Sequence, residues 1–472
     1  MKKYIYLIKN MGLLTISNFG AKLLSFFLVP LYTSILTTKD YGIYDIFNTT
    51  IMLLIPILTT GMIEAVIRFP LTDKENKDEI YLIGIKHLLS GFAVLVLICI
   101  LNYLIPISNT LKQYSILFLA MYFTAAISQL LQSYARGIEM VGALAISGII
   151  GAITVIALNI WFLVFLKWAL VGYFLANIIG MLLTTIYLIF ALNIWKINPF
   201  KKITNKKLEK DMMSYSIPTI ANSISWWVNN AADRYIIIAL FGLATNGIYS
   251  VSYKIPSIMT VFQSIFNQAW SISAVQEFDP EDSNGFYKNI YRMTNFFMIL
   301  ACSSLIILTK ILAKILYKGQ FYAAWEYVPF LLISVLFGSL VGVLSGVFIA
   351  VKDSKRLGIS TIIGAFVNVG SGIILSLIIG PIGAAAGTML SYIMVWIIRL
   401  IDIRRYIHIS INLRRDICSY VLLFIQSLCL LITKNTVLTY FIQLILFLII
   451  FLINFEEIRM ILIKLGILSK DK

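Results

Sequence analysis

Charged residues are scarce in this sequence. Asp, Glu, Lys and Arg together make up 13% of the 472 residues, whereas hydrophobic residues make up 60%. Soluble globular domains are about one-quarter charged, so this composition excludes a soluble domain of this length and indicates a polytopic membrane protein. The formal net charge of +16 lies mainly in short connections between apolar runs. The orientation of the protein in the membrane explains this placement of the basic residues better than binding to nucleic acid does.

Residues that hold metals or perform covalent catalysis are scarce as well. The two histidines, His87 and His408, are too far apart in the sequence for a zinc site. Four cysteines lie in apolar runs without metal-ligand spacing, and we interpret them as small buried hydrophobic residues: Cys99, Cys302, Cys418 and Cys429. The chain has no phosphate-binding loop, no His-Glu-x-x-His motif and no nucleophile elbow. We therefore expect no metal, no cofactor and no enzymatic activity.

Long apolar runs dominate the sequence instead. Each is about 20 residues or more, which is enough for a helix to cross about 30 Å of hydrocarbon. The predicted fold is an all-α polytopic membrane protein of about 14 transmembrane helices, at residues 12–36, 43–67, 80–105, 114–135, 144–166, 169–193, 213–241, 246–273, 293–313, 327–350, 357–380, 383–403, 415–433 and 436–455. The connections are too short to bury cores of their own, so a substrate must be handled within the membrane.

A basic stretch at residues 196–212 divides these runs into two groups. It is rich in lysine and has no long apolar run, which is typical of a cytoplasmic linker. We predict an N-terminal six-helix lobe at residues 1–195 and a C-terminal six-helix lobe at residues 213–405. Residues 406–472 would add two further transmembrane helices and a cytoplasmic tail.

The distribution of Lys and Arg predicts the orientation in the membrane. If the N-terminus is inside, only a few basic residues fall in outer connections: Lys39, Lys112, Lys167, Lys314, Lys318 and Lys434. Most of the others fall in inner connections, as the positive-inside rule requires. We therefore expect both termini in the cytoplasm and the protein in the cytoplasmic (inner) membrane.

A weak internal repeat relates the two predicted lobes. Residues 146–152 recur as residues 359–365, and residues 169–172 recur as residues 384–387, in the same order and at matching spans. Six spans per lobe is an even number, so both lobes would enter the membrane in the same direction. This pattern predicts a parallel repeat about an axis along the membrane normal.

Charges inside the apolar runs gather in the first two spans of each lobe. They are Lys22, Asp45, Glu64 and Arg68 in the first lobe, and Asp233, Arg234 and Lys254 in the second. A charge in hydrocarbon costs about 3 kcal/mol on insertion scales, so we expect these residues to line a polar cavity, as in a transporter. The sum is net positive and fits a phosphate-bearing substrate. The three acids, Asp45, Glu64 and Asp233, are candidates for ion coupling.

Glu64 and Arg68 also have a structural interpretation. Thr60, Glu64 and Arg68 follow helical spacing, so Glu64 and Arg68 would be able to neutralise each other along the helix. Asn222, Asn229 and Asp233 follow helical spacing after Pro218.

In the eighth span, a stripe of alternating four- and three-residue spacing contains Tyr249, Tyr253, Pro256, Thr260, Gln263, Asn267 and Trp270. Its aromatic and hydroxyl groups suit the faces and hydroxyls of sugars, and the alternative is contact between helices.

Several motifs resemble those of a known family. Residues 23–33 followed by residues 41–44 resemble the N-terminal pattern of polysaccharide flippases. Residues 233–235, 247–250, 253–256 and 325–330 resemble later parts of that pattern. The chain is thus similar, over nearly its whole length, to the Wzx-type lipid-linked oligosaccharide flippases of the multidrug/oligosaccharidyl-lipid/polysaccharide exporter superfamily.

This resemblance implies a MATE-like fold, with two lobes in a V around a central cavity, and alternating access. It implies transport of a polyprenyl-pyrophosphate-linked oligosaccharide to the outer leaflet, for capsule, exopolysaccharide or O-antigen assembly. Arg234 and Lys254 are the first candidates to bind the pyrophosphate, and Lys22 and Arg68 the second. Further expected cavity residues are Asn222, Asn229, Tyr249 and Tyr253. The implied partners are the lipid-linked substrate, membrane lipid, and the polysaccharide polymerase and chain-length machinery, with no nucleic acid.

Three other functions remain open. A multidrug or cation extruder shares the fold but favours an acid-dominated cavity. A peptidoglycan lipid-precursor flippase is also close, although such proteins have a more arginine-rich first half. A membrane glycosyltransferase or polysaccharide polymerase would need an acid-rich catalytic loop or a large outer loop, and neither is evident.

Overall fold

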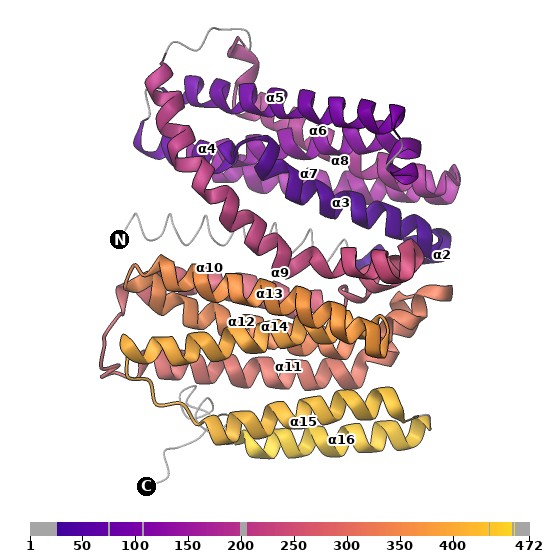
Figure 1. The fold of residues 1–472 in the computed structure, drawn as a ribbon, viewed down its shortest axis with the longest axis vertical. Coiled ribbons are helices and arrows are strands. Elements are labelled where there is room, and N and C mark those ends of the chain that lie inside the picture. Colours follow the sequence, from indigo (N-terminus) through magenta and orange to yellow (C-terminus); the bar gives the residue numbers. More distant parts are fainter. Residues whose placement is uncertain are drawn as a thin grey trace. The chain divides into compact units, whose positions relative to one another are not determined.

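The computed structural model describes residues 26–73, 76–105, 108–198, 205–433, 435–455 and 457, and every regular element in these residues is a helix (Figure 1). The chain divides into two compact units, Met1–Trp227 (unit 1) and Val228–Lys472 (unit 2). The division falls inside a long helix, later in the chain than the predicted linker at residues 196–212. The lobe boundaries given above stay a prediction.

Unit 1 is built around helix α6. Its helices are α2 (Val29–Ile35), α3 (Thr38–Leu58), α4 (Met62–Thr72), α5 (Lys77–Leu104), α6 (Asn109–Gly137), α7 (Val141–Asn159) with a π-helical end (Ile160–Phe165), α8 (Ala169–Ala191), a 3-10 turn (Ile194–Lys196) and the first part of α9 (Lys206–Ser252). Helix α6 packs against α4, α5 and α8, and α7 packs along α8 (Figure 1). The side chains of Tyr122, Leu130 and Leu131 on α6 are fully buried at these contacts.

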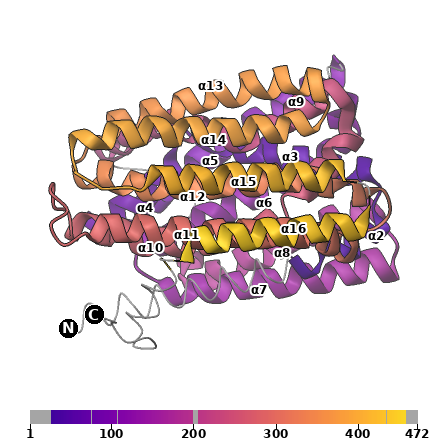
Figure 2. The same cartoon turned by 90° about the horizontal axis from the view of Figure 1, so that it is seen from below.

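Unit 2 is built around helix α12. It contains the end of α9, α10 (Pro256–Gln276), α11 (Phe286–Leu316), a 3-10 segment (Gly319–Glu326), α12 (Val328–Ala350), α13 (Ser354–Ile379), α14 (Ile382–Asp402) with a 3-10 end (Ile403–Arg405), α15 (Leu413–Ile432) and α16 (Thr436–Ile453). Helix α12 packs against α10, α11 and α14. Helices α13 and α14 lie side by side, and the α15–α16 pair packs on α11 (Figure 2).

Glycines on α12 explain its close approach to α10. A Cβ atom on Gly342 would lie 2.9 Å from Asn267 Oδ1, and one on Gly346 would lie 2.4 Å from Trp270 Nε1. The Trp270 indole N–H donates to the Val343 carbonyl at 2.9 Å. Small residues that let two helix backbones approach are typical of helix contacts inside membranes. For this part of the predicted polar stripe, contact between helices is therefore the correct interpretation.

Twelve helices among the described residues are long and apolar enough to cross a membrane, and the chain is a multi-pass membrane protein. Two of the predicted spans are not among these twelve. The run at residues 12–36 lies mostly outside the described residues, and the run at 246–273 corresponds in part to α10, whose polar stripe lowers its mean hydropathy. The total of 14 spans stays a prediction.

Two predicted spans are wrong as continuous helices. The span at 43–67 is broken between α3 and α4, where Thr60 and Gly61 have φ values of 53° and 67°. Thr60 therefore does not share a helix face with Glu64. The span at 246–273 is interrupted after Ser252, and Pro256 begins α10. Proline lacks a backbone N–H and fits the first turn of a helix, so it marks this new start.

The interpretation of all four cysteines as buried is also wrong in part. Cys99 and Cys302 are buried, Cys429 is half-buried and Cys418 is exposed on the surface of α15. A helix surface in a membrane faces hydrocarbon, so an exposed position there suits a small apolar residue as well as a core position does.

Candidate functional site

On unit 1, the break between α3 and α4 forms one side of a pocket. Pro56 lies within the last turn of α3, and the Gly61 N–H donates to the Pro56 carbonyl at 2.7 Å. A Cβ atom on Gly61 would lie only 2.5 Å from the Ser216 carbonyl oxygen of α9. Glycine is required at this position by both its positive φ and this contact. The break therefore allows α9 to approach α3 and α4 closely.

Two hydrogen bonds hold α9 in this position. The Ser216 hydroxyl donates to the Thr60 carbonyl at 2.8 Å, and the Trp227 indole N–H donates to the Thr49 carbonyl at 2.9 Å. Thr60 has left the helical conformation, and its carbonyl is one of the groups that a helix end leaves without an intrahelical partner. The strained turn and the polar face of α9 thus satisfy each other.

The pocket has a volume of about 360 Å³. It is lined by Met52, Ile55, Pro56, Gly61, Ile63, Glu64, Gln129, Asn222, Ser223, Trp226 and Trp227. Two predicted residues, Glu64 and Asn222, thus lie in one pocket, and both are exposed to it. Among the described residues that line it, Glu64 is the only charged one. Two indoles, two amides and one carboxylate give aromatic faces together with hydrogen-bonding groups, which suits a polyhydroxylated ligand or an organic cation.

The other predicted residues of unit 1 lie outside this pocket. Arg68 is exposed on α4, and its guanidinium carbon lies 5.5 Å from the centre of the Tyr215 ring. In the described part of the chain no ion pair joins Glu64 to Arg68, so their mutual neutralisation along the helix is not observed. Asp45 is half-buried on α3 and does not line the pocket. Lys22 lies outside the described residues.

On unit 2, the Asp233 carboxylate is the centre of a closed polar cluster. Asp233 is 2% exposed. Its Oδ2 atom accepts hydrogen bonds from the hydroxyls of Tyr249 (2.7 Å), Tyr253 and Thr388 (3.5 Å). Its Oδ1 atom accepts from Arg234 Nη1 at 3.3 Å. A buried carboxylate with this many donors is well compensated for the loss of water.

Arg234 is held by this cluster on two sides. Its Nη1 atom also donates to the Asn230 carbonyl at 3.0 Å, and its guanidinium carbon lies 4.6 Å from the centre of the Tyr253 ring. Four predicted residues, Asp233, Arg234, Tyr249 and Tyr253, therefore meet in one place. The Arg234 guanidinium is directed to Asp233, so an anionic ligand would have to compete with that carboxylate.

Asn229 extends the cluster toward α13 and α14. Its Nδ2 atom donates to the Thr361 carbonyl at 3.1 Å, and its own carbonyl accepts from Asn368 Nδ2 at 3.4 Å. Asn368 also donates to the hydroxyl of Thr388, the residue that contacts Asp233. The sequence analysis missed Asn368 and Thr388, since a single polar residue in an apolar run carries no periodic signal.

Lys254 is half-buried in the turn between α9 and α10. Its backbone N–H donates to the Val251 carbonyl at 3.0 Å, and its carbonyl accepts from the Ser257 hydroxyl at 2.6 Å. The backbone on both sides of Lys254 is therefore fixed.

Arg399 is a buried cation that the sequence analysis missed. It is 5% exposed on α14, and its N–H groups donate to the hydroxyls of Ser360, Thr361 and Ser345 and to the carbonyls of Val341 and Leu357. These acceptors come from α12 and α13, so Arg399 joins three helices. The signal in the sequence that could have identified Arg399 is its position inside an apolar run.

The sequence matches the family described as "Polysaccharide biosynthesis protein" over residues 7–275. No curated protein matches it significantly. The fold is similar to that of the lipid II flippase MurJ in an inward closed conformation, at 16% identity and a TM-score of 0.69, covering 95% of this chain and 99% of MurJ.

An inward-facing multidrug resistance transporter of the MATE family is 17% identical with a TM-score of 0.63, covering 82% of this chain and 95% of the transporter. A transporter of the MOP superfamily from Pyrococcus furiosus, described as having a binding pocket of reversed polarity, is 15% identical with a TM-score of 0.58. The match covers 90% of this chain and 97% of that transporter. At these identities the likeness shows a shared fold, and the expectation of a MATE-like fold is confirmed.

Proposed function

This chain belongs to the polysaccharide biosynthesis protein family, and from that premise we propose that it is a flippase for a polyprenyl-pyrophosphate-linked oligosaccharide. It carries the repeat unit across the cytoplasmic membrane by alternating access, for the assembly of capsule, exopolysaccharide or O-antigen. The observation that carries the proposal is the pocket of unit 1. Its indoles and amides offer the stacking faces and the donors and acceptors that sugar rings and hydroxyls need.

We propose different roles for the cations. Arg68 is exposed and contacts the neutral Tyr215 ring, so its guanidinium is available for bidentate contact with a phosphate. Lys254 offers a second, point-like charge from a fixed turn. Arg234 is paired with Asp233 and contributes when that pair opens. This order places Arg68 before Arg234, the reverse of the order implied by the family resemblance.

We propose that Asp233 is the coupling group. Arrival of a proton or a monovalent cation at its carboxylate would neutralise the charge that holds Arg234. The released guanidinium would then bind the substrate pyrophosphate, so that substrate and coupling ion would favour the same state. Both termini are proposed to be cytoplasmic, and the polymerase and chain-length machinery are proposed to receive the flipped unit.

One observation favours a second function. In the part of the chain that the structure describes, Glu64 is the only charged residue that lines the pocket of unit 1, and it lies there with two tryptophans. An acid beside aromatic faces suits an organic cation, which is the substrate expected for a multidrug or cation extruder. The peptidoglycan-precursor flippase also remains an alternative of the same fold.

A deletion strain tests the proposal. We expect loss of surface polysaccharide and accumulation of a polyprenyl-pyrophosphate oligosaccharide, detected by mass spectrometry of lipid extracts. Wild-type protein and the control W195A should restore the polymer, whereas W226A should not. Trp195 is 61% exposed and Trp226 is 58% exposed, but only Trp226 lines the pocket. Unchanged polymer and lipids together with new sensitivity to cationic drugs would overturn the flippase and favour the extruder.

A further inference from the structure

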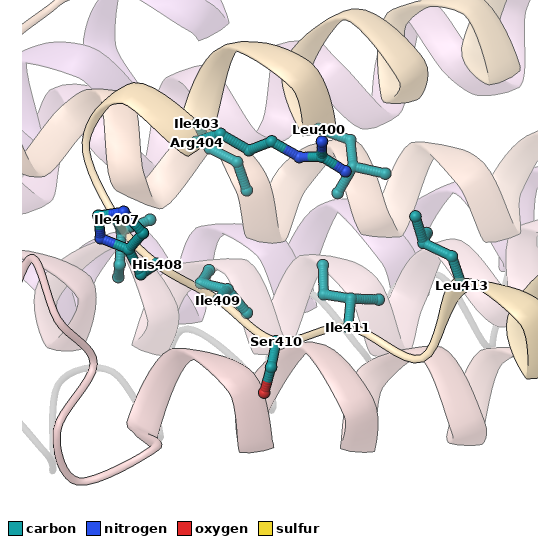
Figure 3. A pocket seen from close by; sticks show the side chains of 9 residues that line it. All are labelled: Leu400, Ile403, Arg404, Ile407, His408, Ile409, Ser410, Ile411 and Leu413. Carbon is teal, nitrogen blue, oxygen red and sulfur yellow. The ribbon is translucent and has the colours of Figure 1, made fainter.

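The connection between α14 and α15 encloses a second hollow, away from the cluster around Asp233. It has a volume of about 510 Å³. The residues that line it are Leu400, Ile403, Arg404, Ile407, His408, Ile409, Ser410, Ile411 and Leu413 (Figure 3). Six of these nine side chains are Leu or Ile, and one carries a permanent positive charge. A ligand that matches this lining has both an apolar part and an anionic group.

The hollow is formed by a fixed segment of chain. Ile403 and Ile407 are 2% and 1% exposed, so they anchor the connection to the body of unit 2. The His408 N–H donates to the Pro280 carbonyl at 2.9 Å, and the Tyr406 hydroxyl donates to Asp353 Oδ2 at 2.5 Å. These contacts position the connection before any ligand binds, which lowers the entropic cost of binding.

Several acids near the connection lie beside basic groups, and one of them, Glu281, has its Oε1 atom 3.6 Å from Nδ1 of the lining residue His408. Arg356 pairs with Asp353 at 3.2 Å and with Asp402 at 3.1 Å. The hydrogen bond from Tyr406 lowers the pKa of the Asp353 carboxyl, so this acid stays ionised and continues to hold Arg356. No carboxylate is among the described residues that line the hollow.

Arg404 is the cation that is left to face the hollow. It is exposed, and none of the ion pairs in the described residues includes it. Figure 3 shows its side chain extending along α14 toward Leu400, while Ile409, Ile411 and Leu413 lie on the opposite side of the hollow. A charged head would thus lie at one side and an apolar chain at the other.

The depth of the hollow in the membrane further restricts which kinds of ligand it could bind. One candidate span ends at Arg405 and the next begins at Leu413. The connection between them therefore lies where the chain leaves the hydrocarbon, at the level of lipid headgroups. Basic pockets at this level bind the phosphates of anionic lipids.

We propose that this hollow binds an anionic phospholipid of the surrounding bilayer, with its phosphate on Arg404 and the start of one acyl chain on the isoleucines. This lipid site does not depend on which substrate the protein transports. A phospholipid bound here bridges the end of α14 and the start of α15, and so fastens the C-terminal helix pair to the rest of unit 2.

The test is native mass spectrometry of the full-length protein with added phosphatidylglycerol or phosphatidylcholine. Loss of one Arg contact costs about 1 kcal/mol, so R404Q should bind phosphatidylglycerol about fivefold more weakly, with binding of phosphatidylcholine unchanged. R414Q is the matched control, because Arg414 is an exposed arginine in the first turn of α15 and does not line the hollow. I409W, which fills the hollow without changing charge, should also weaken binding.

Three results would overturn the proposal. The first is equal loss in R404Q and R414Q, which would show a diffuse surface charge effect. The second is full retention of phosphatidylglycerol by I409W. Competition by millimolar glycerol 3-phosphate alone would likewise replace the lipid with a free phosphate as the ligand. Thermal unfolding of each variant in detergent is measured in parallel, and R404K keeps the test valid if R404Q does not fold, because it should retain most of the binding.

Discussion

On unit 1 the side chains around Glu64 line an open hollow, whereas on unit 2 the side chains around Asp233 close on one another. Glu64, Asn222 and Trp226 are exposed to a pocket of about 360 Å³. Asp233 is 2% exposed, and its oxygens accept hydrogen bonds from hydroxyls and a guanidinium of the same unit. Open groups are available to a ligand, while closed groups change partners only when a charge is added or removed. In the function proposed above, this difference places recognition at the first site and switching at the second.

The largest effect is expected from removing the acid of the closed cluster. D233A leaves the Arg234 charge and two tyrosine hydroxyls buried without their acceptor, so it should destabilise the protein by about 3–5 kcal/mol. Thermal unfolding of purified protein in detergent measures this. The double variant D233A/R234A should recover part of the loss. An unfolding temperature of D233A equal to that of the wild type would show that the cluster is not closed.

A smaller loss of stability is expected from one hydroxyl of the cluster. Tyr249 is fully buried, and its hydroxyl donates to Asp233 Oδ2. A hydrogen bond to a charged group contributes about 1.5–3 kcal/mol, so Y249F should lower stability by that amount. Y122F is a control, because the Tyr122 hydroxyl is buried without a hydrogen-bond partner in the structure. Equal destabilisation of both variants would contradict the role given to Tyr249.

On the open site, the expected effect is on transport and not on stability. W226A should lower the flipping rate about tenfold, which corresponds to about 1.4 kcal/mol of lost contact with a sugar face. Its unfolding temperature should stay near that of the wild type, because the Trp226 side chain is 58% exposed and contributes little to packing. A reconstituted flipping assay with W195A as control checks this. Loss of stability without a change in rate would reverse the assignment.

The smallest effect is expected from the acid of the pocket. E64Q keeps the size of the side chain and replaces a carboxylate that only accepts hydrogen bonds with an amide that both donates and accepts them. Flipping of an oligosaccharide should therefore change by no more than about twofold, and stability by less than about 0.5 kcal/mol. E139Q is the control on an exposed acid outside the pocket. A large loss in E64Q alone, together with loss of cation export, would favour the extruder.

Much of the helical framework follows from the sequence, because apolar length determines a spanning helix. The runs at 327–350 and 383–403 agree with α12 and α14 within a few residues at each end. The breaks were missed although Pro56, Gly61 and Pro256 signal them, since hydropathy does not register backbone conformation.

The contacts of the candidate site were less accessible to prediction. Periodicity placed Asn229 and Asp233 on one face of a helix, and the structure places them in one network. Arg234 was expected to bind the pyrophosphate on the basis of the family resemblance, and neighbours in sequence do not normally face each other on a helix. Its long side chain nevertheless reaches Asp233 at 3.3 Å. Such a pairing depends on side-chain conformation, which the spacing of residues in the sequence does not predict.

The central claim is tested most directly by purified protein reconstituted into liposomes with a fluorescent polyprenyl-pyrophosphate oligosaccharide. A membrane-impermeant glycosidase reports how quickly the inner-leaflet lipid reaches the outer leaflet. The account predicts transfer well above that of protein-free liposomes, reduced about tenfold in W226A and unchanged in W195A. Transfer at the protein-free rate, in liposomes where the same protein exports an organic cation, would contradict it.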